Sequence, residues 1–178
     1  MPGSILPQIA RASISNRLGF AHPEPAFPPE FLEPGATFVT LSLEGMLRGC
    51  IGSLAAHRPI VEDTRQNALA AAFGDPRFPP LGKDEHERIR IEVSLLSEPE
   101  PLIFSGEKEA ISQLRPGIDG IVFQCGARRS TFLPQVWESL PVPADFLSQL
   151  KRKAGFPEGF WSQEVRLFRY GVTKWKES

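Results

Sequence analysis

Apolar residues recur at helical spacing in two segments of the chain. Residues 4–18 place them at Ile5, Ile9, Ala12, Ile14 and Leu18, which predicts an amphipathic helix. Gly19 follows and is a natural left-handed cap. Residues 58–74 repeat this pattern after Pro59, a residue favoured at the first helical position, and end at Gly74. Both segments are therefore predicted to be helices that bury one face.

Period-two alternation marks the strands. Residues 36–54 read as a hairpin that turns at Glu44-Gly45, because β-branched and aromatic residues alternate with small polar ones on each side. Residues 88–96 alternate in the same way and predict another strand. Five prolines in residues 22–35 exclude a helix or a central strand there, so an extended surface arm is expected. A short helix is expected from Ser105.

The second half of the chain follows the same order. A hairpin turning at Cys125-Gly126 is expected in residues 120–134, then helical segments at 134–140 and 143–155, then a last strand near 163–172. Gly45 and Gly126 each precede an arginine, Arg48 or Arg129, by three residues. These parallels indicate an internal duplication of a hairpin, helix and strand unit. The predicted fold class is α+β with flanking helices and a mixed, mostly antiparallel sheet.

Length and composition limit the classes of protein. The 178 residues fit one domain, or two closely packed halves of about 1–100 and 101–178. Twenty basic and 21 acidic side chains give a net charge of -1, which disfavours nucleic acid as a partner. No window reaches the roughly 18 apolar residues of a membrane span, and no leader pattern opens the chain. We therefore expect a cytoplasmic protein that binds no membrane.

Cysteine and histidine usage predicts neither a disulfide nor a bound metal. Cys50 and Cys125 are expected to be free thiols in a reducing compartment. His22, His57 and His86 lie far apart in the sequence, with no second ligand at metal-binding spacing. No cofactor motif is present either, so no cofactor is expected.

The motif LRGCIGSL, residues 47–54, is the first candidate site. Strict strand alternation would put Arg48 and Cys50 on one face, where the guanidinium would favour a reactive thiolate. Gly49 and Gly52 remove side-chain bulk and would let a ligand or another backbone approach. Cys50 is thus a candidate catalytic nucleophile. The alternative is that Cys50 is a small residue packed under the following helix.

A second candidate is DPRFPPL, residues 75–81, whose prolines stiffen the loop that carries Asp75 and Arg77. Arg48 and Arg77 together would clamp a carboxylate or phosphate. The alternative is structural: Asp75 accepts backbone amide bonds in the turn and Arg77 forms a salt bridge elsewhere. Glu92 and Ser94 would add a carboxylate and a hydroxyl if their strand neighbours the hairpin; otherwise they belong to a solvated sheet face.

Seven ordered motifs carry a resemblance to a known family. They are FVTL, LRGCIGSL, DPRFPPL, IEVSLLSEPEPL, GIDGIVF, FLPQVW and LKRKAGFP. Together they resemble the AmmeMemoRadiSam system protein A family, also called the AMMECR-one domain, over nearly the whole chain. The resemblance implies an α+β domain of two intertwined β-rich halves with a barrel-like sheet. It also implies a link to a Memo-type protein and to a radical S-adenosylmethionine enzyme.

Two functions from different classes are consistent with these residues. The first is an accessory module that binds a small anionic ligand or a protein partner around the LRGCIG motif. The second is a cysteine-dependent enzyme that uses Cys50 as nucleophile or carrier in a modification pathway. The family resemblance names no reaction, so the sequence leaves open whether the protein is an enzyme.

Overall fold

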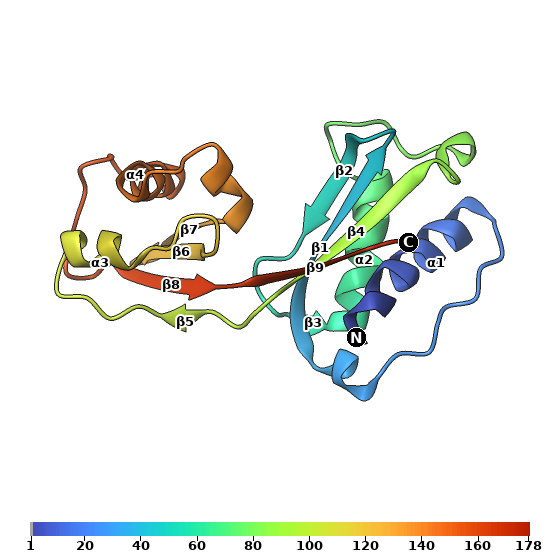
Figure 1. Ribbon diagram of the computed structural model, residues 1–178, viewed down its shortest axis with the longest axis horizontal. Coiled ribbons are helices and arrows are strands. Elements are labelled where there is room, and N and C mark those ends of the chain that lie inside the picture. Colours follow the sequence, from blue (N-terminus) through green and yellow to red (C-terminus); the bar gives the residue numbers. More distant parts are fainter. Residues whose placement is uncertain (1) are drawn as a thin grey trace. The chain divides into compact units, whose positions relative to one another are not determined.

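The computed structural model describes residues 2–178 (Figure 1). The α-helices of this range are α1 Leu6–Leu18, α2 Ile60–Phe73, α3 Glu107–Gln113 and α4 Pro143–Lys153. Its strands are β1 Pro34–Leu43, β2 Met46–Gly52, β3 Arg58–Pro59, β4 Ile89–Leu96, β5 Glu100–Pro101, β6 Gly120–Cys125, β7 Arg128–Phe132, β8 Arg166–Tyr170 and β9 Val172–Lys176. Short 3-10 helices occupy Pro2–Ile5, Pro29–Leu32, Lys83–Glu85 and Pro134–Glu138.

The chain divides into two compact units. The first runs to Leu96 and takes in Thr173–Ser178, and the second is Ser97–Val172. Each unit has its own hydrophobic core and its own sheet. The two units are therefore described one at a time.

The first unit is a sheet in the order β2-β1-β4-β9, with β3 paired to β1. β1 runs antiparallel to both of its long neighbours. Helix α2 packs on β1 and β2, and α1 packs on α2 and β4 (Figure 1). The alternating residues Val39, Leu41, Ile91 and Val93 join both helices in one core, which leaves the other residues of these strands on the opposite, open face.

The second unit is a sheet in the order β5-β8-β6-β7, again with antiparallel pairing. Helix α4 packs against β7, and α3 packs against α4. Phe123, Phe146 and Leu150 are fully buried members of its core. Lys151 is only 1% exposed, because its ammonium group donates to Glu107 and to the carbonyl of Phe160. Lys151 lies in the last turn of α4, where a cation interacts favourably with the helix dipole. Its nearly complete burial goes beyond what that role requires.

The predicted α+β class with antiparallel sheets is confirmed, but the barrel-like sheet is not. Each sheet of the described residues ends on two separate edge strands, β2 and β9 or β5 and β7. A closed barrel needs its first and last strands to pair. The strands are instead divided between two open sheets, each built around its own hairpin.

The end of the first helix and the turn of the first hairpin have the backbone conformations that the sequence predicts. Helix α1 ends at Gly19, whose φ of 89° is the expected left-handed cap. Glu44 and Gly45 both have positive φ, 53° and 82°, as the two-residue hairpin turn requires. The second hairpin turns one residue later than expected, since Cys125 pairs with Arg128. No helix described in residues 2–178 is long and apolar enough to cross a membrane.

Candidate functional site

The LRGCIG strand, β2, lies at the edge of the first sheet, and the loop of residues 75–77 covers part of that edge. The backbone N–H of Cys50 donates to Asp75 Oδ2 at 3.0 Å, and the carbonyl of Cys50 accepts from Arg77 Nη2 at 3.3 Å. Both groups would otherwise be unpaired, because the other side of the strand is taken by β1. The loop therefore caps the edge of β2 at Cys50.

Asp75 and Arg77 also hold each other. The Asp75 carboxylate accepts from Arg77 Nη2 at 2.7 Å, from its Nε at 3.0 Å and from its backbone N–H at 3.0 Å. These bonds to Arg77, with the amide of Cys50, keep the pKa of the buried Asp75 carboxyl well below its ordinary value. Asp75 is therefore a charged structural acceptor, as the structural alternative expected, but the salt bridge of Arg77 is made with Asp75 itself and not elsewhere.

Arg48 occupies a β-bulge. Leu41 pairs with Gly49 and Ser42 with Leu47, so Arg48 is left without a partner on β1. Its guanidinium donates twice to the Glu85 carboxylate, at 2.7 and 3.0 Å, and this bond lowers the pKa of Glu85. The bulge interrupts the strict alternation that would place Arg48 beside the Cys50 thiol. Arg129, which the spacing from the turn made equivalent to Arg48, lies in no bulge, because it pairs regularly with Gln124. The two arginines are therefore not equivalent in structure.

The buried Arg48 side chain keeps one unused donor. The residue is 8% exposed, and its Nη1 has no hydrogen-bond partner within residues 2–178. Its guanidinium carbon lies 5.9 Å from the centre of the Phe78 ring, and that of Arg77 lies 5.6 Å from the same ring. The two arginines that were expected to act together are thus neighbours around one aromatic side chain.

The glycines of the motif are explained by close packing. A Cβ atom at Gly49 would lie 2.1 Å from the carbonyl oxygen of Ala71 in α2, so the helix backbone fills that space. A Cβ atom at Gly52 would lie 2.2 Å from the Phe38 ring. It is therefore another backbone and an aromatic ring that approach these glycines closely.

Cys50 belongs to a polar row on the open face of the first sheet. Thr40 pairs with Cys50 on one side and with Glu92 on the other, so the three side chains stand side by side across β2, β1 and β4. The Thr40 hydroxyl lies 3.3 Å from the Cys50 sulfur. Lys174 and Lys176 reach the Glu92 carboxylate at 3.5 and 3.4 Å. We refer to Cys50, Thr40 and Glu92 as the polar row.

The expected Ser94 lies in the neighbouring register, opposite Phe38, which in turn pairs with Gly52. The condition set for Glu92 and Ser94 is met, because their strand, β4, neighbours β1, the first strand of the hairpin. Sequence reasoning missed Thr40, since a threonine in a strand is unremarkable by itself. Its alternation with the core residues Val39 and Leu41 is the signal that places it on the open face.

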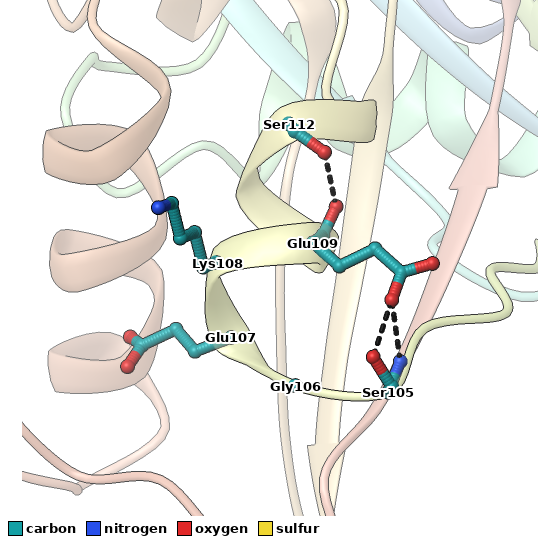
Figure 2. A pocket seen from close by; sticks show the side chains of 6 residues that line it. All are labelled: Ser105, Gly106, Glu107, Lys108, Glu109 and Ser112. Carbon is teal, nitrogen blue, oxygen red and sulfur yellow. Dashed lines mark hydrogen bonds between the residues drawn. The ribbon is translucent and has the colours of Figure 1, made fainter.

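Other candidate chemistry is weaker. No group of three or more His, Cys, Asp or Glu side chains in residues 2–178 is arranged to hold a metal ion. Cys125 is buried, and the described residues contain no disulfide between Cys50 and Cys125. A hollow of about 580 Å³ lies at the start of α3 (Figure 2), but there Ser105 donates to the Glu109 carboxylate and Ser112 to the Glu109 carbonyl. These bonds belong to the first turn of the seven-residue helix α3, so the hollow has a structural explanation.

The architecture defines a class of α+β protein with two hairpin-led antiparallel sheets and a capped edge strand at the LRGCIG motif. The model of the AMMECR1 family matches residues 7–175, so the chain belongs to the AMMECR1 family. A protein of Methanothermobacter thermautotrophicus is 36% identical over 94% of this chain and 90% of its own length. A protein of Thermotoga maritima is 38% identical over 86% and 85%.

A solved structure agrees with this assignment. The crystal structure of an uncharacterized protein from Pyrococcus horikoshii superposes with a TM-score of 0.83 at 31% identity, covering 99% of this chain and 91% of that one. The family resemblance and the fold class are therefore confirmed.

Proposed function

We propose that this AMMECR1-family chain is an accessory module that binds a small anionic ligand or a protein partner at the LRGCIG edge. One observation carries the proposal: the guanidinium groups of Arg48 and Arg77 lie 5.9 and 5.6 Å from the centre of the same Phe78 ring. Two neighbouring arginines are a common arrangement for carboxylate or phosphate recognition, because each presents a planar fork of donors.

Each arginine retains donor capacity after its internal bonds are counted. Arg77 uses Nε and Nη2, and its Nη1 has no partner in the part of the chain that the structure describes, while its side chain is 54% exposed. Arg48 uses Nε and Nη2 on Glu85, and its buried Nη1 is unpaired. Asp75 and Glu85 balance the charges, so the attraction for a ligand lies in the hydrogen-bond donors more than in net charge.

The test uses the thiol of Cys50 as a local reporter, because Arg77 donates to the carbonyl of that residue. Inorganic phosphate or succinate, added at constant ionic strength, is expected to raise the melting temperature and to slow alkylation of Cys50 in a saturable way. Cys125 serves as the internal control. Arg77→Lys keeps a cation beside Asp75 but removes the fork, so it should abolish the protection.

Arg152→Gln is the matched control. Arg152 is a half-exposed arginine of α4 in the second unit, paired with Glu158, and its replacement should leave the protection of Cys50 intact. Absence of any protection in the unmodified protein, or equal protection in Arg77→Lys, would overturn the ligand-binding proposal.

A second candidate function is a cysteine-dependent enzyme with Cys50 as nucleophile or carrier. It is favoured by the polar row, in which the Thr40 hydroxyl lies 3.3 Å from the Cys50 sulfur and Glu92 stands on the other side of Thr40. A hydroxyl that donates to the sulfur stabilises the thiolate. The check is the pH profile of Cys50 alkylation in the folded protein, and a profile identical to that of a free thiol would count against an enzyme.

We further propose that a Memo-type protein and a radical S-adenosylmethionine enzyme are partners of this chain, as the family resemblance implies. Co-elution of the purified proteins in size-exclusion chromatography tests this, and separate elution of all three at micromolar concentrations would contradict it. A cytoplasmic location is proposed on the two free thiols, which suit a reducing compartment. Cell fractionation checks that location.

A further inference from the structure

A polar hollow in the first unit has none of Cys50, Thr40, Arg48 and Arg77 in its lining, although Lys176, which lines it, also reaches Glu92 of the polar row. Its volume is about 570 Å³, within the range of roughly 300–1,000 Å³ typical of small-molecule sites. Its lining includes Arg11 of α1, His22 of the arm, His86 and Glu87 before β4, Arg90 of β4 and Lys176 of β9.

Two histidines that are 64 positions apart in the sequence meet at this hollow, and adjacent residues of α1 hold both. The side-chain amide of Asn16 donates to the carbonyl of His22 at 2.8 Å and accepts from its backbone N–H at 3.0 Å. The Ser15 hydroxyl lies 2.7 Å from His86 Nε2. The His86 ring also stacks on Phe20, with centroids 4.6 Å apart. The histidines are therefore positioned by the fold.

His86 already binds a carboxylate on its other nitrogen. Its Nδ1 lies 2.9 Å from Glu87 Oε1. The His86 residue is only 6% exposed, whereas the Glu87 side chain is 90% exposed. A carboxylate so open to water is easily displaced. The buried imidazole nitrogen thus marks a position where the oxyanion of a ligand can replace that of Glu87.

Further donors at the hollow are not fully used. Arg90 makes one long bond, at 3.3 Å to the carbonyl of Ile89. Lys176 shares the carboxylate of Glu92 with Lys174, and the imidazole of His22 has no partner within residues 2–178, because only its backbone is bonded.

Arg11 differs from these donors. It gives two bonds to Glu177 and one each to the carbonyls of His86 and Ile89. The donors of Arg11 are therefore saturated, while Arg90, Lys176 and His22 can bind a ligand directly and His86 can do so once the exposed Glu87 side chain moves away.

We propose that this hollow is a binding site for a small molecule that carries a carboxylate or phosphate group. Arg90 and Lys176 supply the charge, His86 Nδ1 and the ring of His22 supply directed donors, and Glu87 swings away when the ligand enters. Charge-assisted hydrogen bonds of this kind are the strong ones in proteins. The proposal does not depend on the function proposed for Arg48 and Arg77.

Histidine resonances provide a local test, because the chain has only three histidines. The probes are inorganic phosphate and citrate, titrated at fixed pH and ionic strength while the imidazole C–H signals are followed by NMR. The signals of His22 and His86 should move in a saturable way. His57, which is exposed and does not line the hollow, should stay still. Arg90→Gln should weaken binding at least tenfold, and Arg77→Lys should leave it unchanged.

Three outcomes would overturn the site. They are the absence of saturable shifts, equal movement of all three histidine signals, and an affinity unchanged by Arg90→Gln, which would mean an adventitious ion only. Asn16→Ala adds a check on geometry, since it releases His22 without removing a charge. It should weaken binding less than Arg90→Gln does, while the His86 signal still responds.

Discussion

The two units share a strand order but differ in the chemistry that the order presents. In each unit the first strand of a hairpin lies in the middle, with the second hairpin strand on one side and a later strand on the other: β2-β1-β4 in the first and β7-β6-β8 in the second. A helix separates the hairpin from that later strand in both cases. The two units are thus comparable position by position, starting from the hairpin turns.

The polar row of the first unit has no full counterpart in the second unit. Counted from the turn, the fourth pair is Thr40 with Cys50 in the first unit and Val122 with Thr131 in the second. The next strand contributes Glu92 in the first unit and Phe168 in the second. The second unit forms the same arrangement of strands with apolar residues at two of these three positions. Val122 and Thr131 are buried, whereas Thr40, Cys50 and Glu92 are half-buried. Exposure therefore accounts for part of the difference, and a chemical role for the polar row needs its own test.

Replacing Gly49 should have the largest effect. Its counterpart is Ser130, whose hydroxyl donates to the Leu150 carbonyl of α4 at 2.7 Å. Gly49→Ser would put a Cβ atom 2.1 Å from the Ala71 carbonyl oxygen. Since backbone must then move, we expect a loss of about 3 kcal/mol in the free energy of unfolding. Ser130→Ala should lose about 1 kcal/mol, the value of one hydrogen bond.

Urea denaturation of the two variants measures this difference. Should Gly49→Ser prove no more destabilising than Ser130→Ala, the close approach of α2 to β2 would not be the reason for glycine. The comparison of the two hairpins would then lose its clearest structural contrast.

Many of the elements compared above could be predicted from the sequence, and those that could not have physical reasons. Periodicity predicts α1, α2 and both hairpins, because amphipathic burial determines those elements locally. The bulge at Arg48 escapes prediction, since a one-residue shift leaves the neighbouring apolar pattern intact. The sequence pointed to Asp75 and Arg77 in one stiff loop, but their ion pair with each other and their contact with the backbone of Cys50 depend on the folded conformation.

Longer-range features were hidden more completely. His22 and His86 read as isolated residues because no local pattern links the arm to the segment before β4. Likewise, the separation into two sheets rather than one barrel depends on which edges pair, and period-two alternation is the same in both arrangements.

The side chains that bind the free edges of β2 and β7 should have the next largest effect on the free energy of unfolding. In the first unit Asp75 accepts from the backbone of Cys50, and in the second Lys153 Nζ donates to the carbonyl of Thr131, the counterpart of Cys50, at 2.9 Å. Asp75→Asn should cost about 2 kcal/mol at neutral pH, because a buried charged acceptor of several bonds is lost. Thermal or urea unfolding across pH measures it.

The pH dependence of that cost has a definite sign. The pKa of Asp75 is lower in the folded protein than in the unfolded chain, so its contribution is fully present above about pH 4 and is lost as the pH falls further. The stability of the Asn variant should therefore approach that of the unmodified protein in acid. A cost that stays constant from pH 7 to pH 3 would show that shape, not charge, is what Asp75 provides.

Lys153, which binds the edge of β7, should contribute less to the free energy of unfolding than Asp75 does. Lys153→Met keeps the aliphatic stem but removes the bond to the Thr131 carbonyl and the contact of the ammonium with the Phe132 ring, 5.1 Å away. We expect a cost of about 1 kcal/mol. A loss that equalled that of Asp75→Asn would make the two caps equivalent.

The smallest expected change in stability tests the polar row itself. Thr40→Val gives the first unit the residue that the second has at Val122. The hydroxyl contributes only a weak bond to sulfur and valine suits a strand, so the free energy of unfolding should change by less than about 0.5 kcal/mol. Alkylation of Cys50 at neutral pH should nevertheless slow severalfold, because the variant removes a hydroxyl that lies 3.3 Å from the sulfur and can donate to it. Cys125 in the same sample reports any general loosening of the fold. An unchanged Cys50 rate, with stability also unchanged, would reduce the row to a solvated sheet face and leave Arg48 and Arg77 as the distinguishing chemistry of the first unit.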